Sequence, residues 1–168
     1  IRMLDALISE PLDEGNDHFD PTSLQVSTID IGNTATNVIP ARANAVFNIR
    51  FNDMHSSKTL TEWCRQKFEA IGGRYDFRVE VSGESFITPP GPLSDLMADA
   101  VQDVLGRRPE LSTTGGTSDA RFIHHYCPVA EFGMISQSMH KVNERADVAD
   151  IEALTKIYLR MLDRYFAA

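Results

Sequence analysis

Two short segments near the C-terminal end carry the residue types most suited to chemistry. Residues 113–121 read TTGGTSDAR, and residues 138–144 read SMHKVNE. The two glycines, Gly115 and Gly116, let the backbone turn tightly and approach a ligand, and the free amides at the start of a following helix attract a carboxylate or an oxyanion. In the second segment His140 stands in a polar loop, and imidazole is the most common metal ligand in proteins. The segments predict a ligand-binding turn and a metal-binding histidine.

Each segment also has an ordinary interpretation. A lone histidine is a weak signal, and His140 is compatible with a surface side chain whose ring pairs with Glu144. The glycine segment by itself fits a plain connection from a strand to a helix, with Ser118 capping the helix. It is not a phosphate loop, because no lysine follows the glycines.

Two residues in the first half are further candidates for binding. Thr36–Pro40 reads TNVIP and leads into a strand in which apolar and polar residues alternate. The amide of Asn37 can contact a substrate or cap a turn. Arg50 lies on the polar face of that strand, where an arginine is usually a solvated charge, although its planar fork also binds carboxylates in a bidentate manner. The remaining histidines have no ligand spacing and are interpreted as structural: His18, His55, His124 and His125.

The helices and strands that position Asn37 and Arg50 can be predicted from the hydrophobic pattern. Hydrophobic spacing predicts a helix over 2–12, strands over 23–31 and 43–51, a helix from Ser56 or Ser57 to 71, and a strand over 75–81. In the first strand Leu24 and Val26 share one face and Ile29 the other, which suggests a bulge or two buried faces. The order helix, strand, strand, helix, strand predicts a ferredoxin-like α+β sandwich that lacks its first strand.

The pattern changes after a boundary placed at 83–88, which divides the chain into 1–83 and 84–168. Helices are expected over 93–105 and 118–125 and from Asp147 or Asp150 to about Tyr165, with short strands over 110–113 and 128–133. Helices that alternate with short strands predict an α/β domain. Two such strands do not form a stable sheet alone, so they need partners.

Composition narrows the classes of function. The chain has 168 residues and a formal net charge of −8, which does not favour nucleic acid or an anionic membrane as a partner. No apolar run approaches the roughly 20 residues that span a bilayer. Cys64 and Cys127 give no disulfide framework and are expected to be buried thiols in a reducing cytoplasm. Because the chain starts at Ile1, directly before helical spacing, we expect it to be part of a longer protein.

Together these segments resemble the two-zinc amidohydrolases, the family of aminoacylases and zinc carboxypeptidases, and are most similar to its succinyl-diaminopimelate desuccinylase branch. The matching segments stand in family order: 36–40, 48–50, 115–119, 131–133 and 140–144. The resemblance covers nearly all of this chain but only about the C-terminal half of such an enzyme. Ser136 departs from the pattern, which usually has Asn there.

The resemblance implies a fold and a set of roles. Residues 1–83 would be a partial lid domain that mediates homodimerisation, and 84–168 the end of an α/β zinc-hydrolase catalytic domain. His140 would be the terminal ligand of one zinc in a site that holds two, where cobalt can substitute. The substrate would contact four residues: Asn37, Arg50, Gly116 and Thr117.

The implied reaction is metal-assisted hydrolysis of a small N-acyl amino acid, N-succinyl-L,L-diaminopimelate, to succinate and diaminopimelate on the route to lysine. No segment matches the family's other zinc ligands or its general base, so no catalytic residue is assigned and the chain alone is expected to be inactive. Two alternatives stay open. One is another deacylase or dipeptidase of the family, such as an acetylornithine deacetylase, and the other is a dimerisation module without activity.

Overall fold

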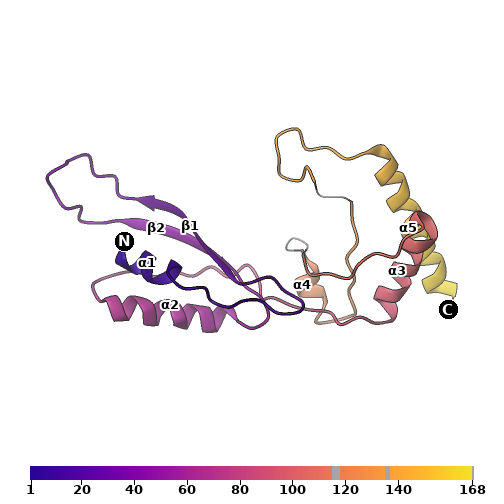
Figure 1. The fold of residues 1–168 in the computed structure, drawn as a ribbon, viewed down its shortest axis with the longest axis horizontal. Helices are drawn as coiled ribbons and strands as arrows, with labels where there is room; N and C mark the ends of the chain where they lie inside the picture. The colour runs from indigo at the N-terminus through magenta and orange to yellow at the C-terminus, as the bar shows by residue number, and fades with distance from the viewer. Residues whose placement is uncertain (115–117, 135–136, 168) are drawn as a thin grey trace. The chain divides into compact units, whose positions relative to one another are not determined.

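A computed structural model describes residues 1–114, 118–134 and 137–167. The chain forms two compact units, Ile1–Phe86 and Ile87–Ala168. Figure 1 shows their helices and strands in chain order. Helices and a two-stranded antiparallel sheet make the chain a mixed α and β protein.

The sheet of the first unit is an antiparallel hairpin of β1 (Ser23–Asp30) and β2 (Asn44–Arg50). Its register shifts between Val26 and Thr28. Ser27, between them, donates a hydrogen bond from Oγ to the carbonyl oxygen of Val46 at 3.1 Å. The irregularity accounts for the change of phase in the sequence, since an extra residue in one strand moves the following side chains to the opposite face.

Two helices cover one face of this hairpin (Figure 1). These are α1 (Arg2–Ile8) and α2 (Ser57–Ile71). Ser56 caps α2 by accepting a hydrogen bond from the Thr59 amide at 3.1 Å, and Gly72 ends the helix at a φ of 75° that favours glycine. The core of the unit joins helix and sheet side chains: Leu7, Cys64 and Phe68, packed against Leu24, Phe47 and Ile49.

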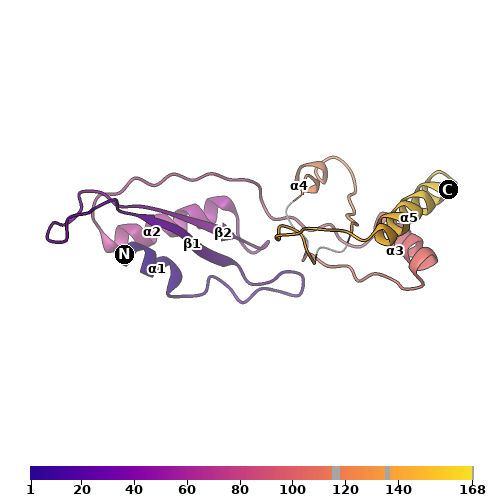
Figure 2. The ribbon, with the colours of Figure 1, turned by 90° about the horizontal axis from the view of Figure 1, so that it is seen from above.

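The strand predicted over 75–81 does not form. The coil after α2 runs back along the unit without pairing to β1 or β2 (Figure 2). The alternating aromatic residues of this segment nevertheless pack on the core. Phe77 stacks on Phe47 with ring centroids 6.2 Å apart, and the rings of Tyr75 and Phe68 meet edge to face with centroids 5.3 Å apart. A strand requires a hydrogen-bonded neighbour as well as an alternating pattern, and in the described part of the chain this segment has none. The predicted first helix is also shorter than expected, ending at Ile8.

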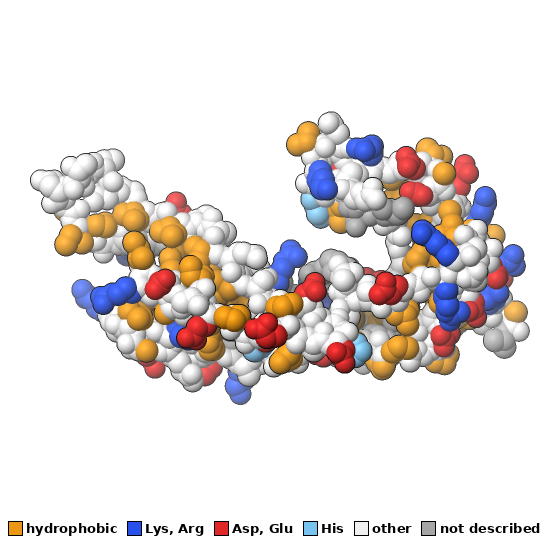
Figure 3. Space-filling view, in the orientation of Figure 1, with side chains coloured by type: hydrophobic (Ala, Val, Ile, Leu, Met, Phe, Trp, Pro, Cys, Tyr) orange, Lys and Arg blue, Asp and Glu red, His pale blue; other side chains and the backbone are white. Residues whose placement is uncertain are grey.

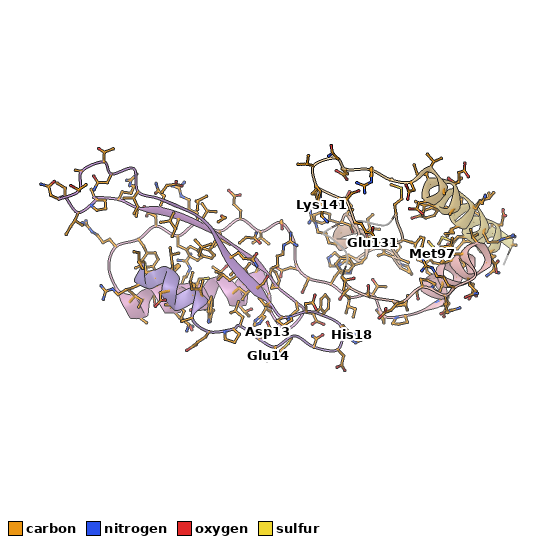
Figure 4. The ribbon with its side chains drawn as sticks, turned by 45° about the horizontal axis from the view of Figure 1, so that its top comes forward. Asp13, Glu14, His18, Met97, Glu131 and Lys141 are labelled. Atoms are coloured by element: carbon orange, nitrogen blue, oxygen red, sulfur yellow. The ribbon has the colours of Figure 1, made fainter. Side chains whose placement is uncertain are left out.

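The second unit is centred on the packing of α3 (Pro92–Leu105) against α5 (Val148–Ala167). Met97, labelled in Figure 4, lies on α3 in the core of the unit. It packs with three other buried residues: Ala100, Val101 and Ile157. Charged side chains gather over the helix pair (Figure 3). Their ion pairs join Arg108 to Asp95 and Asp99, Arg160 to Asp103, and Arg164 to Asp99 and Asp103.

The expected short strands of the second unit, 110–113 and 128–133, are extended segments without partners among the described residues. The second of them contacts the helices, since Tyr158 Oη donates to the carbonyl oxygen of Phe132 at 2.5 Å. The helix expected over 118–125 is reduced to α4 (Ala120–Ile123). The strands did not form because a hydrophobic pattern indicates which residues are to be buried but does not supply the neighbouring strand that pairing requires.

The two cysteines differ in environment. Cys64 is 1% exposed and lies in the core of the first unit, as predicted, whereas Cys127 is exposed, and the prediction that it is buried was wrong. Burial raises the pKa of the Cys64 thiol to about 11. Among the helices that the structure describes, none combines the length and apolar character that crossing a membrane requires.

Candidate functional site

The loop that carries His140 is tightly defined. Ser138 Oγ donates to the carbonyl oxygen of Arg145 at 2.6 Å and accepts from its amide at 3.1 Å, which closes the loop. Lys141, labelled in Figure 4, adds a bond from Nζ to the carbonyl oxygen of Gln137 at 2.7 Å. His140 itself has a φ of 61°, a left-handed conformation that is uncommon outside glycine. The loop therefore holds the exposed imidazole at a fixed point of the backbone.

His140 is exposed, as its interpretation as a surface residue expects. The pairing with Glu144 is not seen, since no hydrogen bond or ion pair joins the two among the interactions of the described residues. Nor does the structure build a metal site around it. In the described part of the chain, no three His, Cys, Asp or Glu side chains converge. The six residues outside that part are Gly, Gly, Thr, Ile, Ser and Ala. Zinc sites use three or four protein ligands, and among the described residues His140 has no such set around it.

The glycine segment is described only at its ends. Gly116 and Thr117, predicted to line the substrate pocket, lie outside the described residues. At the start of α4, Ser118 Oγ accepts a hydrogen bond from the amide of Ala120 at 3.1 Å. The N-cap of α4 is Asp119, whose side chain makes no capping hydrogen bond, so Ser118 is not the cap that the sequence predicted. The Ser118 contact instead closes a turn directly before the helix.

Asn37 lies in the exposed loop between β1 and β2. The turn around it is held by another residue, Asn33. The side chain of Asn33 donates to the carbonyl oxygens of Ala35 at 3.2 Å and Val38 at 2.8 Å, and accepts from the Ala35 amide at 3.1 Å. Asn33 thus performs the capping that was the alternative interpretation of Asn37, whose own amide makes no hydrogen bond to the described residues.

Arg50 ends β2 opposite Ser23. Its neighbour Ile49 packs into the core, so Arg50 faces away from the helices, as the alternation predicts. The guanidinium is exposed and forms no ion pair within the described parts of the chain. Its donors are therefore open to an external carboxylate.

The structure does not bring Asn37 and Arg50 together. The loop of Asn37 follows β1 at one end of the hairpin, and Arg50 is the last residue of β2 at the other end (Figure 1). A strand rises about 3.4 Å per residue, so the length of β2 alone separates them by about 20 Å. A small acyl amino acid cannot span both side chains.

Beside Arg50 the structure places a buried polar cluster that the sequence did not reveal, centred on Asp13 (Figure 4). Asp13 is 4% exposed in its side chain. Its Oδ1 accepts from the amides of Gly15 at 2.7 Å and Thr22 at 3.1 Å and from Asn52 Nδ2 at 2.8 Å, and its Oδ2 contacts His55 Nε2 at 2.9 Å. Because Thr22 precedes β1 and Asn52 follows β2, the cluster holds the open end of the hairpin.

Burial alone would raise the pKa of Asp13, but the hydrogen bonds from Thr22, Gly15 and Asn52 outweigh it and hold the pKa well below the ordinary value. The carboxylate is therefore ionised at neutral pH and acts as an acceptor. The prediction that His55 is structural agrees with its place here. Only the spacing of Asp13 from a turn glycine, Gly15, could have signalled this acceptor from the sequence.

Comparison with known proteins gives a consistent picture. The model of peptidase family M20/M25/M40 matches residues 3–164. The succinyl-diaminopimelate desuccinylase of Rhodospirillum rubrum is 57% identical over 166 residues, which are 96% of this chain and 42% of that protein. Succinyl-diaminopimelate desuccinylase 1 of Ruegeria sp. is 53% identical over 170 residues, 99% of this chain and 45% of the relative. The desuccinylase of Rhodospirillum centenum is 54% identical over 164 residues, 98% of this chain and 42% of the relative.

The chain thus spans less than half the length of these curated relatives. The identities of 53–57% over nearly the whole chain indicate that this chain and its relatives share a fold. The family match extends through both units. The predicted resemblance is confirmed, and the chain belongs to peptidase family M20/M25/M40.

Proposed function

We propose that this chain forms part of a zinc-dependent amidohydrolase that cleaves N-succinyl-L,L-diaminopimelate to succinate and diaminopimelate in the cytoplasm. One observation carries the proposal: several relatives with more than half of their aligned residues identical are succinyl-diaminopimelate desuccinylases. Since the aligned regions cover 42–45% of those relatives, the activity is proposed for a protein that contains this chain.

The proposed roles of this chain's residues are binding and orientation. Arg50, exposed and without an ion pair in the described structure, would bind a substrate carboxylate through two parallel N–H donors. Asn37 would offer its free amide, and Gly116 and Thr117 would line the pocket for the carboxylate end. Because Asn37 and Arg50 lie about 20 Å apart along the hairpin, they would serve different substrate molecules or different active sites of a dimer.

For the metal, the chain supplies one candidate ligand. His140 is held in a closed loop with its imidazole exposed. This arrangement suits a metal ligand whose partner ligands come from outside this chain. The family is metal-dependent, and the metals would activate water and polarise the amide carbonyl when bound. Because no further ligands converge among the described residues, the proposal requires at least two ligands per zinc from outside the chain. No catalytic acid or base is assigned to this chain.

The first unit would be a lid that mediates homodimerisation. Its described order is helix, strand, strand, helix and an extended segment whose aromatic rings pack on the core. One added strand that pairs with the extended segment would give a four-stranded ferredoxin-like sandwich. In the second unit, the extended segments 110–113 and 128–133 would join a parallel sheet in the same way, so that α3 and α5 cover the end of an α/β domain.

A chimera provides the test. This chain would replace the matching 166-residue region of the Rhodospirillum rubrum desuccinylase, and hydrolysis of N-succinyl-L,L-diaminopimelate and N-acetylornithine would be compared. We expect turnover of the succinyl substrate with a clear excess in kcat/KM. Preference for the acetyl substrate would assign the chain to another deacylase. A folded dimer with no hydrolysis of either would support the dimerisation module.

A further inference from the structure

The paired part of the hairpin ends at a residue to which the proposed function gives a role. Ser23 and Arg50 are the last partners in the register of β1 and β2, so strand pairing supports Arg50 from one side only. Strand ends open more readily than strand centres. The guanidinium of Arg50 is exposed and forms no ion pair within the described ranges. Its direction therefore depends on how firmly the backbone at the end of β2 is held.

The loop between α1 and β1 holds the two strands together where their pairing ends. The buried carboxylate of Asp13 accepts at Oδ1 from the Thr22 amide at 3.1 Å and from Asn52 Nδ2 at 2.8 Å. The same Nδ2 donates to the carbonyl oxygen of Asp20 at 3.3 Å, and the Asn52 amide donates to Thr22 Oγ1 at 3.3 Å. Because Thr22 and Asn52 are both buried, loss of one of these contacts leaves polar groups unpaired away from water.

This loop is fixed by contacts of its own. Gly15 has a φ of 77°, and a Cβ atom there would lie 2.6 Å from a backbone oxygen of the same loop, so the turn requires glycine. Asn16 Oδ1 accepts from two backbone amides of the loop, at 2.9 and 3.0 Å. Asn16 Nδ2 donates to Asp53 Oδ1 at 2.8 Å. The loop therefore binds two consecutive residues, Asn52 and Asp53, shortly after Arg50.

We propose that Asp13 is a positioning residue for substrate binding: through Asn52 it fixes the backbone that carries Arg50 and so directs the guanidinium toward a substrate carboxylate. A bidentate contact needs such precision, because two N–H donors of the fork must meet two oxygens. Displacement of a binding group by about 1 Å can reduce turnover by about 100-fold. In this role Asp13 itself does not contact the substrate. The inference rests on the proposed function and adds one positioning residue to it.

A double-mutant cycle in the chimera separates positioning from general stabilisation. Asp13→Asn keeps an acceptor oxygen but loses the charge that strengthens its hydrogen bonds, and Asn52→Ala removes the donor that joins Asp13 to the strand. We expect each substitution to lower kcat/KM for the preferred substrate by about 5-fold when Arg50 is present, and by less than about twofold in the Arg50→Lys background. Residues that act through one contact show such non-additive effects.

Two controls match these variants. Phe68→Leu loosens the core of the same unit without altering the loop, and any effect on kcat/KM should be equal in the two backgrounds. Asp17→Ala, an exposed change within the loop, should have no effect in either. The fluorescence of Trp63 during urea unfolding shows whether each variant is folded under the assay conditions.

The outcomes separate this inference from the proposed function. Equal losses in both backgrounds would overturn the inference, because they would show only a general loss of stability, and unchanged kcat/KM in both variants would also overturn it. If the chimera hydrolyses neither substrate, the proposed function is wrong, and the cycle is measured as the Kd for N-succinyl-L,L-diaminopimelate by calorimetry. Coupling between Asp13 and Arg50 in that Kd would support the inference, independent effects would reject it, and absence of binding would reject both proposals.

Discussion

Asp13 and Asn52 are 39 positions apart in the chain, yet Asp13 Oδ1 accepts a hydrogen bond from Asn52 Nδ2 at 2.8 Å. Together with the contacts to Thr22 and His55, this hydrogen bond joins the loop after α1 to the residues just before β1 and just after β2. Arg50 lies two residues before Asn52, so the cluster fixes the backbone next to Arg50, the proposed carboxylate-binding residue. It is a structural cluster that supports a candidate binding residue.

Replacing Asp13 by Ala should destabilise the first unit by about 3 kcal/mol, because it leaves several buried donors unpaired. The single tryptophan, Trp63, packs against the core of that unit, so its fluorescence during urea unfolding reports on this change. Asp17→Ala, an exposed change of the same charge, should alter the free energy of unfolding by less than about 0.5 kcal/mol. Equal effects of the two substitutions would contradict the role of the cluster.

The same carboxylate predicts a pH dependence. Since the pKa of Asp13 is lowered on folding, its stabilising effect is complete above the unfolded value of about 3.9 and is lost as the pH falls through the lower folded pKa. The difference in unfolding free energy between wild type and Asp13→Asn should therefore be constant from pH 6 to about 5 and narrow below about 4. A difference that does not change down to pH 2.5 would show that Asp13 is not hydrogen-bonded as an anion.

The two thiols should react at different rates. Cys64 is buried and burial raises its pKa to about 11, whereas Cys127 is exposed. At pH 8 a disulfide reagent such as Ellman's should label one thiol per native chain quickly and the second only after denaturation, because the thiolate is the nucleophile. The Cys127→Ser chain should show almost no fast labelling. Fast labelling in that variant would mean that Cys64 is accessible.

The packing of α3 on α5 depends on Ile157, which is 1% exposed. Ile157→Ala should destabilise this helix pair by about 2–5 kcal/mol through lost burial and the cavity left behind. Amide hydrogen exchange of the two helices measures the effect. Leu159→Ala, at a position that is 60% exposed on the same helix, provides the control and should leave protection almost unchanged.

Arg50→Lys tests substrate binding in the chimera. Losing a bidentate contact while keeping the charge should weaken transition-state stabilisation by about 1.5–3 kcal/mol, or roughly 10- to 160-fold in kcat/KM. Arg78→Lys, an exposed arginine of the same unit, should leave kcat/KM within twofold. If Arg50→Lys behaves like Arg78→Lys, Arg50 is a solvated charge.

The helices and strands that were predicted well from the sequence are those whose apolar side chains pack against other elements of the same unit. The helix after Ser56 and the strands around Phe47 were placed within one or two residues, because their caps and alternation are local signals. The segments at Tyr75 and Phe132 carried equally good patterns but formed no strands, since pairing depends on a neighbour that no local pattern specifies. The Asp13 cluster escaped prediction for the same reason, as its partners lie far apart in the chain.

For the candidate site, the identity of the residues could be predicted from the sequence, but their arrangement could not. The motifs around Asn37, Arg50 and His140 were sufficient to identify the family, because residue type and order are sequence properties. Their arrangement was not predictable: Asn33, not Asn37, holds the turn, and β2 separates Asn37 from Arg50.

Zinc titration of the 168-residue chain against a chelator, with His140→Ala alongside, tests most directly whether His140 is a zinc ligand that needs partners from outside the chain. We expect the isolated chain to bind zinc only weakly and His140→Ala to change this little, because no further ligands converge on His140 among the described residues. In the chimera we expect two tightly bound zincs, one of which is lost with His140→Ala. Two tight zincs in the isolated chain, or an unchanged zinc content in the His140→Ala chimera, would contradict this role of His140.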